Sequence, residues 1–546
     1  MLYKDISRIL GNYLFYFALI LCLPLAVAIY FEYIADSSSH PQPHTSLEFL
    51  ETIMICIGCA LIFRFLGRNA SGILYRRESI ILAVLIWLIS ALIGALPFYL
   101  SKTLSNPVDA YFEAISGFTT TGATMMAPKA YNAEGQEVPI RVENYHVPGK
   151  VYYYWGTISP IRDSDGKVLF TGVEAVSKAL LFWRSFMQWL GGMGIVVFFL
   201  SVLPALGVGG KFLYQMEMTG PVKDSIAPRI SQTASLLWKL YLSLSIVQVL
   251  LLIWTNNQMP LLDAICVTFS TLSTGGYSIK NNSIASYGNP HTEWIVLLFM
   301  IIGSINFALY FHILRGKFYR IYVPDFFLFV GIIIAGAALV GGYLIYDPSI
   351  GMKHLHEYYS TWEAIREGAF QSVSAQTSTG FTTQNYDVWP FASQIFMLIL
   401  MFVGGMSGAT SGGIKTPRFY LLYKIITHKI ELIFRPETVR KLTYARHEVD
   451  SATAITVLVF FCIAAISTLT GTVIYILDGI DPESSLGLMG CMINNIGMAF
   501  RAAGQDGSFL IMSNLSKLMS CFWMLIGRLE FFAIILLFIP AFWRGR

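Results

Sequence analysis

Four short polar turns, each built around a glycine, recur between the long apolar segments of this chain. They are Thr119-Thr120-Thr121-Gly122-Ala123, Leu272-Ser273-Thr274-Gly275-Gly276, Thr377-Ser378-Thr379-Gly380-Phe381 and Asn494-Asn495-Ile496-Gly497-Met498. Each turn follows a short amphipathic segment and precedes a polar linker and another membrane-length apolar run. Four units of helix, half-helix with a polar turn, and helix would allow one chain to surround a single ion path.

The composition indicates an all-α polytopic membrane protein. Of the 546 residues, 55% are hydrophobic and only 13% are charged, whereas soluble domains carry roughly a quarter charged residues. The mean hydropathy is +0.59. Charges cluster in a few segments and leave apolar runs of about 20 residues, enough to cross a bilayer core of roughly 30 Å as helices. A transmembrane β-barrel would instead show short segments of alternating polarity.

The apolar runs predict ten spans. They are residues 12–34, 48–66, 79–100, 179–206, 232–256, 291–314, 324–346, 392–425, 450–477 and 508–543. The first two form a pair without a turn, and the other eight form four pairs that enclose the turn segments 108–124, 261–278, 363–383 and 483–500.

The chain therefore divides into an N-terminal helix pair and four pseudo-repeated helix–pore loop–helix units around a central ion pore. The predicted boundaries are 1–78 for the pair, 79–210 for unit one with an outer insert at 127–172, 211–320 for unit two, 321–448 for unit three with a glycine-rich loop at 404–415, and 449–546 for unit four.

The spacing before each glycine supports the repeat. Asp109, Glu367 and Ser484 lie thirteen residues before Gly122, Gly380 and Gly497, and Asp263 lies twelve before Gly275. Such residues can accept the free backbone N–H groups at the start of a short helix, so we expect them to cap the half-helices. The repeat is parallel and predicts a ring around an axis normal to the membrane, unlike the inverted repeats of many carriers.

The distribution of basic residues predicts the orientation. Lys and Arg gather in alternate loops, including Arg68, Arg76, Arg77, Lys211, Lys223, Arg229, Arg315, Lys317, Arg320, Lys424, Lys429, Arg435, Arg440, Lys441 and Arg446. Residues 35–47 and 255–262 on the opposite side contain none. The positive-inside rule then places the basic loops and both termini in the cytoplasm.

The turns have the chemistry of a site for a monovalent cation. Rings of backbone carbonyls can replace the hydration shell of such an ion, and glycine adopts backbone conformations closed to other residues. The turns contain no Asp or Glu, which disfavours a calcium site. The half-helices point their C-terminal ends toward the path, where their dipoles favour a cation. A single turn of this kind could be an ordinary helix terminator, whereas four at equivalent places favour a function.

With these motifs the chain resembles the Trk/Ktr/HKT superfamily of potassium transporters, most closely the pore subunits of bacterial Trk systems. The matching stretches are TTTGAT (119–124), STGGYS (273–278), TSTGFTT (377–383), NNIG (494–497), FWRSFMQWLGGMG (182–194), GGMSGATSGGIK (404–415) and GRLE (527–530). The resemblance implies a pseudo-fourfold pore with two extra N-terminal helices, a homodimer, and a cytosolic TrkA-like ring that binds nucleotide. In that family, glycine at all four filter positions accompanies potassium selectivity.

The resemblance also implies a potassium-binding selectivity filter. Its residues would be Thr120, Thr121, Gly122, Ser273, Thr274, Gly275, Ser378, Thr379, Gly380, Asn495, Ile496 and Gly497. Potassium would be the transported ion, with no bound organic cofactor, and nucleotide would act only through the partner.

The span 392–425 contains a dense glycine run that predicts a loop in mid-membrane, since glycine disfavours a regular helix. The run comprises Gly404, Gly405, Gly408, Gly412 and Gly413. The resemblance places it below the filter as a gating loop; the alternative is a helix-packing face of small residues. Arg528, near the middle of the last span, is expected to line the path and to hold this loop through its carbonyls, because a membrane-buried charge usually faces a cavity or a partner. Lys415 could act similarly or only mark the end of the span.

Two further features of unit one are open to interpretation. Glu113 and Arg184 are expected to form a structural pair rather than an ion site. The insert 127–172 contains Tyr152-Tyr153-Tyr154-Trp155 and a turn at Asp163–Gly166, and it predicts a β-hairpin on the outer surface.

We therefore predict potassium uptake across a bacterial inner membrane, by a pore in contact with membrane lipid and not with nucleic acid. The main alternative is a symporter of the same fold that couples potassium to sodium or protons. A lipid-modifying membrane enzyme would need paired acids or histidines near the membrane surface, and a broken-helix solute carrier would need an inverted repeat; neither pattern is evident.

Overall fold

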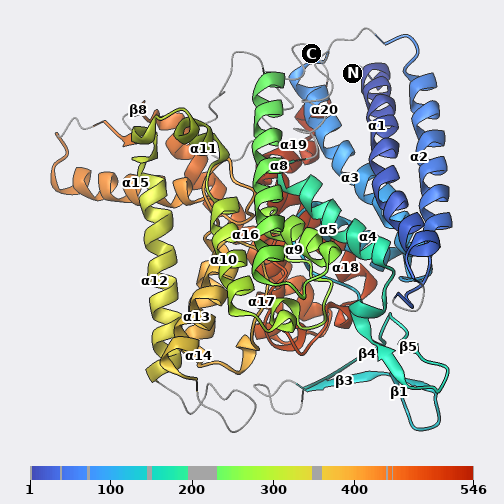
Figure 1. The fold of residues 1–546 in the computed structure, drawn as a ribbon. Coiled ribbons are helices and arrows are strands. Elements are labelled where there is room, and N and C mark those ends of the chain that lie inside the picture. Colours follow the sequence, from blue (N-terminus) through green and yellow to red (C-terminus); the bar gives the residue numbers. More distant parts are fainter. Residues whose placement is uncertain are drawn as a thin grey trace.

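Both ends of the chain lie at one end of a bundle of helices, and a group of short strands lies at the opposite end (Figure 1). The computed structural model describes residues 3–36, 40–70, 74–143, 150–194, 230–346, 359–437, 441–444 and 447–544. Within these residues, six helices are long and apolar enough to cross a membrane, or seven if a pair bent by 95° counts as one span. The chain is a multi-pass helical membrane protein.

The N-terminal pair packs closely because small residues let the two backbones approach. Helix α1 (Tyr3–Ile29) continues through the π-turn η1 (Tyr30–Ile34) and packs against α2 (Ser46–Leu66). A Cβ atom added at Gly11 would lie 2.8 Å from the Arg64 backbone nitrogen and 2.9 Å from the Ala60 carbonyl oxygen. Such close approach is typical of helix packing in membranes.

The first helix of each predicted unit is long and continuous. These helices are α3 (Arg76–Leu100), α8 (Ile230–Thr255), α12 (Pro324–Tyr346) and α16 (Ser451–Leu477). Each agrees with its predicted span to within a few residues.

The second helix of each unit ends or breaks inside the predicted span. Their pieces are α5 (Lys178–Gly192); α10 (Pro290–Ser304) and α11 (Phe307–Leu314); α14 (Phe391–Phe402) and α15 (Thr416–Phe434); and α18 (Asn514–Leu529), α19 (Phe531–Phe538) and α20 (Pro540–Trp543). The predicted break in 392–425 is confirmed. The end of the predicted span 179–206, from residue 195 on, lies outside the described residues, as do Lys211, Lys223, Arg229, Arg440 and Arg446.

Continuous helices over 291–314 and 508–543 were wrong predictions. The helix over 291–314 breaks because the glycine-rich loop enters it. The Met406 amide donates to the Ser304 carbonyl (3.0 Å), and the Phe307 amide donates to the Gly408 carbonyl (3.2 Å). The second breaks at Glu530, whose φ is +64°. Neither cause is visible in the hydropathy of the broken helix itself.

Four short helices enter the bundle and end inside it. They are α4 (Pro107–Phe118), α9 (Leu261–Leu272), α13 (Thr361–Gln376) and α17 (Pro482–Asn494). Single-turn 3-10 segments lie in the connections: η2 (Gly172–Ala175), η4 (Ser283–Tyr287), η5 (Phe318–Ile321), η6 (Tyr386–Val388), η7 (Arg501–Ala503) and η8 (Phe509–Ile511).

The expected N-caps of these short helices were wrong. The side chains that accept the first free N–H groups belong to Asn106, Ser360 and Asp481, while α9 starts after Pro260 with no side-chain cap. The four aligned residues lie inside the helices and bond elsewhere: Asp109 to Lys517, Asp263 to Tyr287, Glu367 to Arg366 and Thr383, and Ser484 to Asp481 and the Ala502 amide.

The outer insert forms three small antiparallel sheets instead of the single hairpin predicted. The pairs are β1 (Ala130–Tyr131) with β2 (Glu137–Val138), β3 (Ile140–Glu143) with β4 (Val151–Tyr154), and β5 (Ile161–Arg162) with β6 (Val168–Phe170). Separately, β7 (Thr443–Tyr444) pairs with β8 (His447–Glu448).

Tyr152 of the insert forms two hydrogen bonds with unit four. The Tyr152 hydroxyl donates to Asp481 Oδ2 (2.7 Å) and accepts from the Asp481 amide (2.9 Å). Burial, together with the bond to the Asp481 carboxylate, raises the pKa of Tyr152 well above its usual value. The phenol therefore stays neutral and can donate to Asp481, the residue that caps α17.

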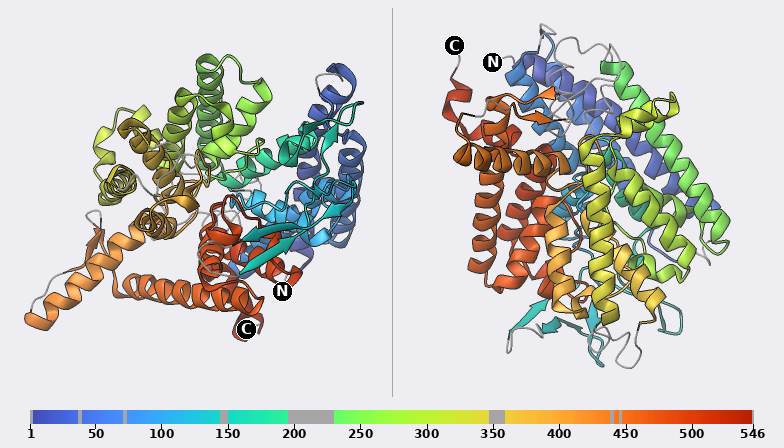
Figure 2. Two further views of the ribbon diagram at one scale, coloured as in Figure 1. Left: turned by 90° about the horizontal axis from the view of Figure 1, so that it is seen from below. Right: turned by 90° about the vertical axis from the view of Figure 1, so that its left-hand side faces the viewer.

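Helix α15 extends sideways from the rest of the bundle, as Figure 1 and the left view of Figure 2 show. Exposed apolar side chains run along it: Tyr423, Ile426, Ile430, Ile433 and Phe434.

Unit one is held by a buried ion pair, as expected for Glu113 and Arg184. Arg184 Nε lies 2.8 Å from Glu113 Oε1, and both side chains are almost completely buried. The same carboxylate accepts from the Met125 amide (2.8 Å), and Arg184 donates to the Ser278 carbonyl (3.0 Å). This pair therefore joins α4, α5 and the segment after the second turn.

Glu113→Ala is expected to lower the free energy of unfolding by about 3–5 kcal/mol, because it leaves the Arg184 charge buried without its partner. Thermal unfolding of the purified protein in detergent measures this change. Glu448→Ala is the matched control: its pair with Lys441 is mostly exposed, so the loss should stay below about 1 kcal/mol. Equal losses in the two variants would contradict a structural role for the Glu113–Arg184 pair.

Candidate functional site: a ring of four turns and the loop beneath it

The turns at the ends of α4, α9, α13 and α17 share one backbone conformation. A non-glycine residue with positive φ follows each helix: Thr120 (56°), Thr274 (52°), Ser378 (59°) and Asn495 (54°). The next residue donates its N–H to a carbonyl five residues back: Thr121 to Ser116, Gly275 to Ser270, Thr379 to Ser374 and Ile496 to Cys491. A positive φ costs a non-glycine residue roughly 1–2 kcal/mol, so its recurrence in all four turns marks a common local structure.

This conformation corrects the predicted alignment of unit two. Two residues after the positive-φ residue come Gly122, Gly276, Gly380 and Gly497, so Gly276 is the counterpart of the other three glycines, and Gly275 is the counterpart of Thr121. Gly276 has a φ of +78°, close to the +82° of Gly122 and Gly380. In this alignment Thr274, Gly275 and Gly276 are the counterparts of Thr120, Thr121 and Gly122. Counted from Gly276, the spacing to Asp263 becomes thirteen, as in the other units.

The four glycines form a closed ring in which each abuts the next turn. A Cβ atom added at Gly122 would lie 2.1 Å from the Gly275 oxygen, and one at Gly276 would lie 1.8 Å from the Thr379 oxygen. At Gly380 it would lie 2.8 Å from the Gly497 nitrogen, and at Gly497 it would lie 2.8 Å from the Gly122 carbonyl carbon. The order runs from unit one through unit four and returns to unit one. Close contact requires glycine at all four positions, and a positive φ favours it further at Gly122, Gly276 and Gly380.

One cavity meets all four glycines of the ring. It has a volume of about 180 Å³, and its lining includes Gly122, Gly276, Gly380 and Gly497 together with residues of the segments that follow each turn. The ring therefore faces a common space, as expected if the turns surround one axis.

Side chains tie each turn to its neighbour around the ring. Tyr277 donates its hydroxyl to the Glu113 carbonyl (2.8 Å) between units two and one, and Ser283 Oγ accepts from the Thr382 amide (3.2 Å) between units two and three. Tyr386 donates to the Ala499 carbonyl (2.5 Å) between units three and four, and Asn495 donates to Thr121 Oγ1 (3.0 Å) between units four and one. A side-chain hydrogen bond therefore joins every pair of neighbouring units around the ring.

The glycine-rich stretch 404–415 is a loop, as predicted, and not a helix-packing face. It doubles back on itself: Gly404 donates to the Ile414 carbonyl (3.0 Å), and Thr416 donates to the Gly405 carbonyl (3.0 Å). Gly408 and Gly413 have φ values of +73° and +70°. A Cβ atom at Gly404 would lie 2.2 Å from the Gly412 oxygen, so side chains would prevent this folding.

The loop lies directly against the turns. The Gly412 amide donates to Ser378 Oγ (2.5 Å), and Thr410 Oγ1 donates to the Leu272 carbonyl at the end of α9 (2.9 Å). A Cβ atom at Gly412 would lie 2.3 Å from the Asn494 oxygen. The loop therefore contacts units two, three and four at once.

Arg528 on α18 connects the loop to unit one. Its guanidinium donates to the carbonyls of Thr410, Gly191 and Gly192 (2.6 Å each) and to Thr120 Oγ1 (3.2 Å). The expected contact between Arg528 and a loop carbonyl is therefore present. The positive charge of Arg528 is thus surrounded by backbone oxygens of units one and three and by the hydroxyl of Thr120.

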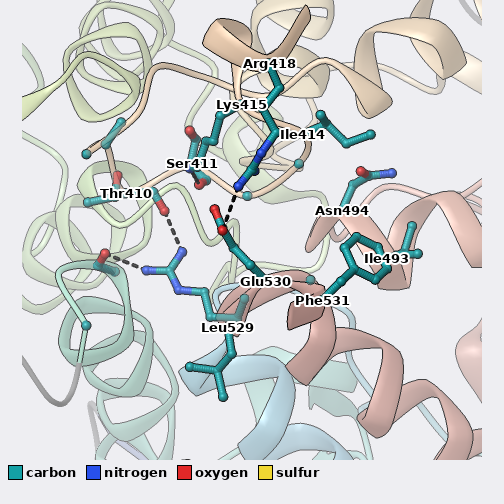
Figure 3. A pocket seen from close by; sticks show the side chains of 18 of the residues that line it. Thr410, Ser411, Ile414, Lys415, Arg418, Ile493, Asn494, Leu529, Glu530 and Phe531 are labelled. Atoms are coloured by element: carbon teal, nitrogen blue, oxygen red, sulfur yellow. Dashed lines mark hydrogen bonds and ion pairs between the residues drawn. The ribbon is translucent and has the colours of Figure 1, made fainter. Parts of the chain in front are cut away.

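A second cavity of about 70 Å³ lies between the loop and the end of α18, where Arg528 lies (Figure 3). Lys415 donates to the Ser411 carbonyl within the loop. Glu530 points toward Arg418 and pairs with it (2.6 Å), and the Arg418 guanidinium stacks on Phe460 at 3.9 Å. Lys415, Arg418 and Arg528 bring three cationic side chains to this cavity, with Glu530 as the acidic residue of its lining.

Several residues of the site were not predicted. Gly276 could have been found from the thirteen-residue spacing of Asp263. Lys517, which pairs with Asp109 at 2.7 Å, and the Arg418–Glu530 pair join residues far apart in the chain and leave no local signal. Clusters of three or more His, Cys, Asp or Glu side chains that could hold a metal ion are absent from the described part of the chain.

These features define a class: a multi-pass membrane protein in which four re-entrant helices end in a ring of polar turns, closed on one side by an intramembrane loop. A family model described as a cation transport protein, TrkH, matches residues 161–331 and 343–544. The chain belongs to this TrkH family.

Individual relatives match over the full length. The Trk system potassium uptake protein TrkH of Salmonella typhimurium is 30% identical over 546 residues, covering 99% of both chains, and the potassium uptake protein TrkG of Escherichia coli is 29% identical with the same coverage. The crystal structure of the potassium transporter TrkH from Vibrio parahaemolyticus superimposes with a TM-score of 0.78 at 27% identity, covering 100% of both chains.

Gly276→Ala is expected to destabilise the protein far more than Gly135→Ala. Both glycines have a φ near +80°, so alanine strains the backbone by roughly 1 kcal/mol at either position. Only at Gly276 does the new methyl group meet backbone, 1.8 Å from the Thr379 oxygen, whereas at Gly135 it meets nothing within 4 Å. Thermal unfolding in detergent compares the two. Similar midpoints would show that the ring is not closely packed.

Proposed function

We propose that the chain takes up potassium ions across the inner, cytoplasmic membrane of a bacterium, through a pore formed by the four turns. The observation that carries the proposal is the closed ring of four equivalent backbone turns on one cavity. Backbone oxygens in such a ring can replace the hydration shell of a monovalent cation. The relatives of the chain that are named as potassium uptake proteins support potassium as the ion.

The filter would be made by the positive-φ residues, the residues after them and the ring glycines. Potassium would bind at Thr120, Thr121 and Gly122 in unit one, Ser378, Thr379 and Gly380 in unit three, and Asn495, Ile496 and Gly497 in unit four. In unit two it would bind at Thr274, Gly275 and Gly276. The C-terminal ends of α4, α9, α13 and α17 meet at the ring, and their dipoles favour a cation there. No organic cofactor is required by this mechanism.

The loop 404–415 with Lys415 and Arg528 would form the gate below the filter. Four hydrogen bonds from Arg528 hold the loop against unit one and leave only about 70 Å³ beside it. Ions would pass when the loop, whose glycines Gly404, Gly405, Gly408, Gly412 and Gly413 allow it to refold, moves away from the turns.

Both termini would lie in the cytoplasm, as the positive-inside rule predicts. Opening would be controlled by a cytosolic TrkA-like ring that binds nucleotide, docked on the basic segment 418–449, and the protein would act as a homodimer. The outward reach of α15 with its exposed apolar side chains supports a contact with a second copy (Figure 2).

The alternative function is a symporter driven by sodium or protons. A symporter needs an inward gradient of the coupled ion, whereas a pore does not.

Rubidium uptake into liposomes tests the filter. Under an inside-negative potential, uptake by the wild-type protein should resist excess sodium, and Gly122→Ser should lose that resistance, because its side chain meets the Gly275 oxygen and distorts the ring. Gly166→Ser, with positive φ in the outer insert and open space around it, is the control and should remain resistant. Uptake that requires a sodium or proton gradient would favour the symporter, and absence of uptake with or without a cytosolic partner would contradict the pore.

Arg528→Ala should raise rubidium uptake in the absence of any cytosolic partner by about tenfold or more, since each lost hydrogen bond from a charged group weakens the closed state by roughly 1.5–3 kcal/mol. Arg320→Ala, in a segment away from the loop, is the control. Unchanged or lower uptake by a folded Arg528→Ala protein would show that Arg528 does not hold a gate shut.

A further inference from the structure

Gln188 on α5 bonds both sides of one ring glycine. Its side chain has no exposed area. The amide nitrogen Nε2 donates to the Gly275 carbonyl (2.7 Å), and the amide oxygen Oε1 accepts from the Tyr277 backbone nitrogen (3.0 Å). Gly276 is the residue between these two, so a side chain of unit one clamps the turn of unit two.

The clamp fixes the direction of the Gly276 carbonyl. In a planar trans peptide the C=O and the N–H point in opposite directions. Because the Tyr277 N–H points at Gln188, the Gly276 carbonyl of the same peptide must point away from α5. Gly276 lines the cavity that the four ring glycines share, whereas Gln188 does not.

Unit two needs such a clamp because its turn lacks a side chain that the others have. Thr121 and Thr379 bond the hydroxyls of Thr119 (2.9 Å) and Thr377 (2.8 Å) within their own turns. Gly275 occupies the equivalent position and has no side chain. A Cβ atom there would lie 2.4 Å from Gln188 Cδ, so the glutamine fills the space that a threonine side chain takes in units one and three.

Besides the bonds between units, each of the other turns has a side-chain bond from its own short helix. Ser116 donates to the Ala123 carbonyl (2.6 Å), Ser374 to the Phe381 carbonyl (2.7 Å), and Cys491 to the Ile496 carbonyl (2.5 Å). Over the described ranges, only the second turn is held by a side-chain amide that bonds the residues on both sides of its ring glycine.

We propose that Gln188 is a positioning residue for ion selection, which acts by orienting the Gly276 carbonyl in the ring. The inference rests on the proposed function, and it assigns to unit one a direct part in shaping the filter of unit two. Without the amide, the peptide between Gly276 and Tyr277 is free to rotate, and the ring loses one oriented oxygen.

Gln188→Met tests this role, because methionine is similar in length and flexible but neither donates nor accepts strongly. Rubidium uptake in liposomes is measured at rising sodium, well below the unfolding midpoint of each variant. We expect the sodium concentration that halves rubidium uptake to fall by about tenfold, the factor that corresponds to a hydrogen bond of ordinary strength.

Gln394→Met is the matched control. Gln394 is also buried and also makes two backbone bonds, to the carbonyls of Asp387 (2.7 Å) and Trp389 (2.9 Å), but it lies outside the ring. Gln394→Met should lower the unfolding midpoint by about as much as Gln188→Met does, and it should leave the sodium resistance unchanged. A Gln188→Met protein that keeps wild-type sodium resistance would overturn the inference.

Gln188→Glu separates positioning from packing and decides the question if the Met variant does not fold. The side chain at this position is fully buried, which favours the neutral carboxyl group. Its C=O can accept from the Tyr277 N–H and its O–H can donate to the Gly275 carbonyl. Gln188→Glu should therefore keep more sodium resistance than Gln188→Met, or, where that variant is unfolded, stay within about threefold of wild type. Loss of resistance as large as the tenfold expected for Met would overturn the inference. A wild-type protein that takes up no rubidium would instead contradict the proposed function.

Discussion

The structure depends on one constraint: backbone groups within a membrane must be satisfied by the protein, because the lipid offers no hydrogen bonds. Four re-entrant helices end inside the bundle in non-helical turns, and such turns persist only where they are packed and bonded on every side. The closed contact of Gly122, Gly276, Gly380 and Gly497 and the bonds between neighbouring units meet this requirement. The long helices form the wall that keeps lipid away from the ring.

The loop 404–415 depends on the same ring. It has no helix of its own and obtains its hydrogen bonds from the ends of α9 and α10 and from the turn of unit three, while Arg528 bonds it to unit one. A loop held by contacts with all four units is sensitive to any movement among them. The loop and the turns are thus built alike, from short segments of irregular backbone that bond one another.

Hydropathy and turn chemistry predicted much of this fold. The N-terminal pair, the four long helices and the four re-entrant helices appear where the sequence placed them, because apolar length and glycine-containing polar turns are local signals. The break at Ser304–Phe307 was missed because its cause, the entering loop, lies far away in the chain. The break at Glu530 was missed because hydropathy does not mark a residue with positive φ. The alignment on Gly275 failed because two adjacent glycines are equivalent by composition and differ only in φ and contacts.

The expected caps illustrate the same limit. Asp109, Asp263, Glu367 and Ser484 have the chemistry of caps and the right spacing, yet bonds to other residues hold them inside the helices. Residue type predicted that these positions were polar and repeated, and three-dimensional packing decided their partners. The Gln188 clamp, which joins α5 to the turn of another unit, was likewise beyond any local pattern.

If the four turns form one potassium site on a common axis, crystals grown in rubidium should reveal it by anomalous diffraction. We expect rubidium peaks within the ring of Gly122, Gly276, Gly380 and Gly497, which weaken when sodium replaces rubidium. Rubidium bound only elsewhere, or a ring that holds sodium equally well, would contradict it.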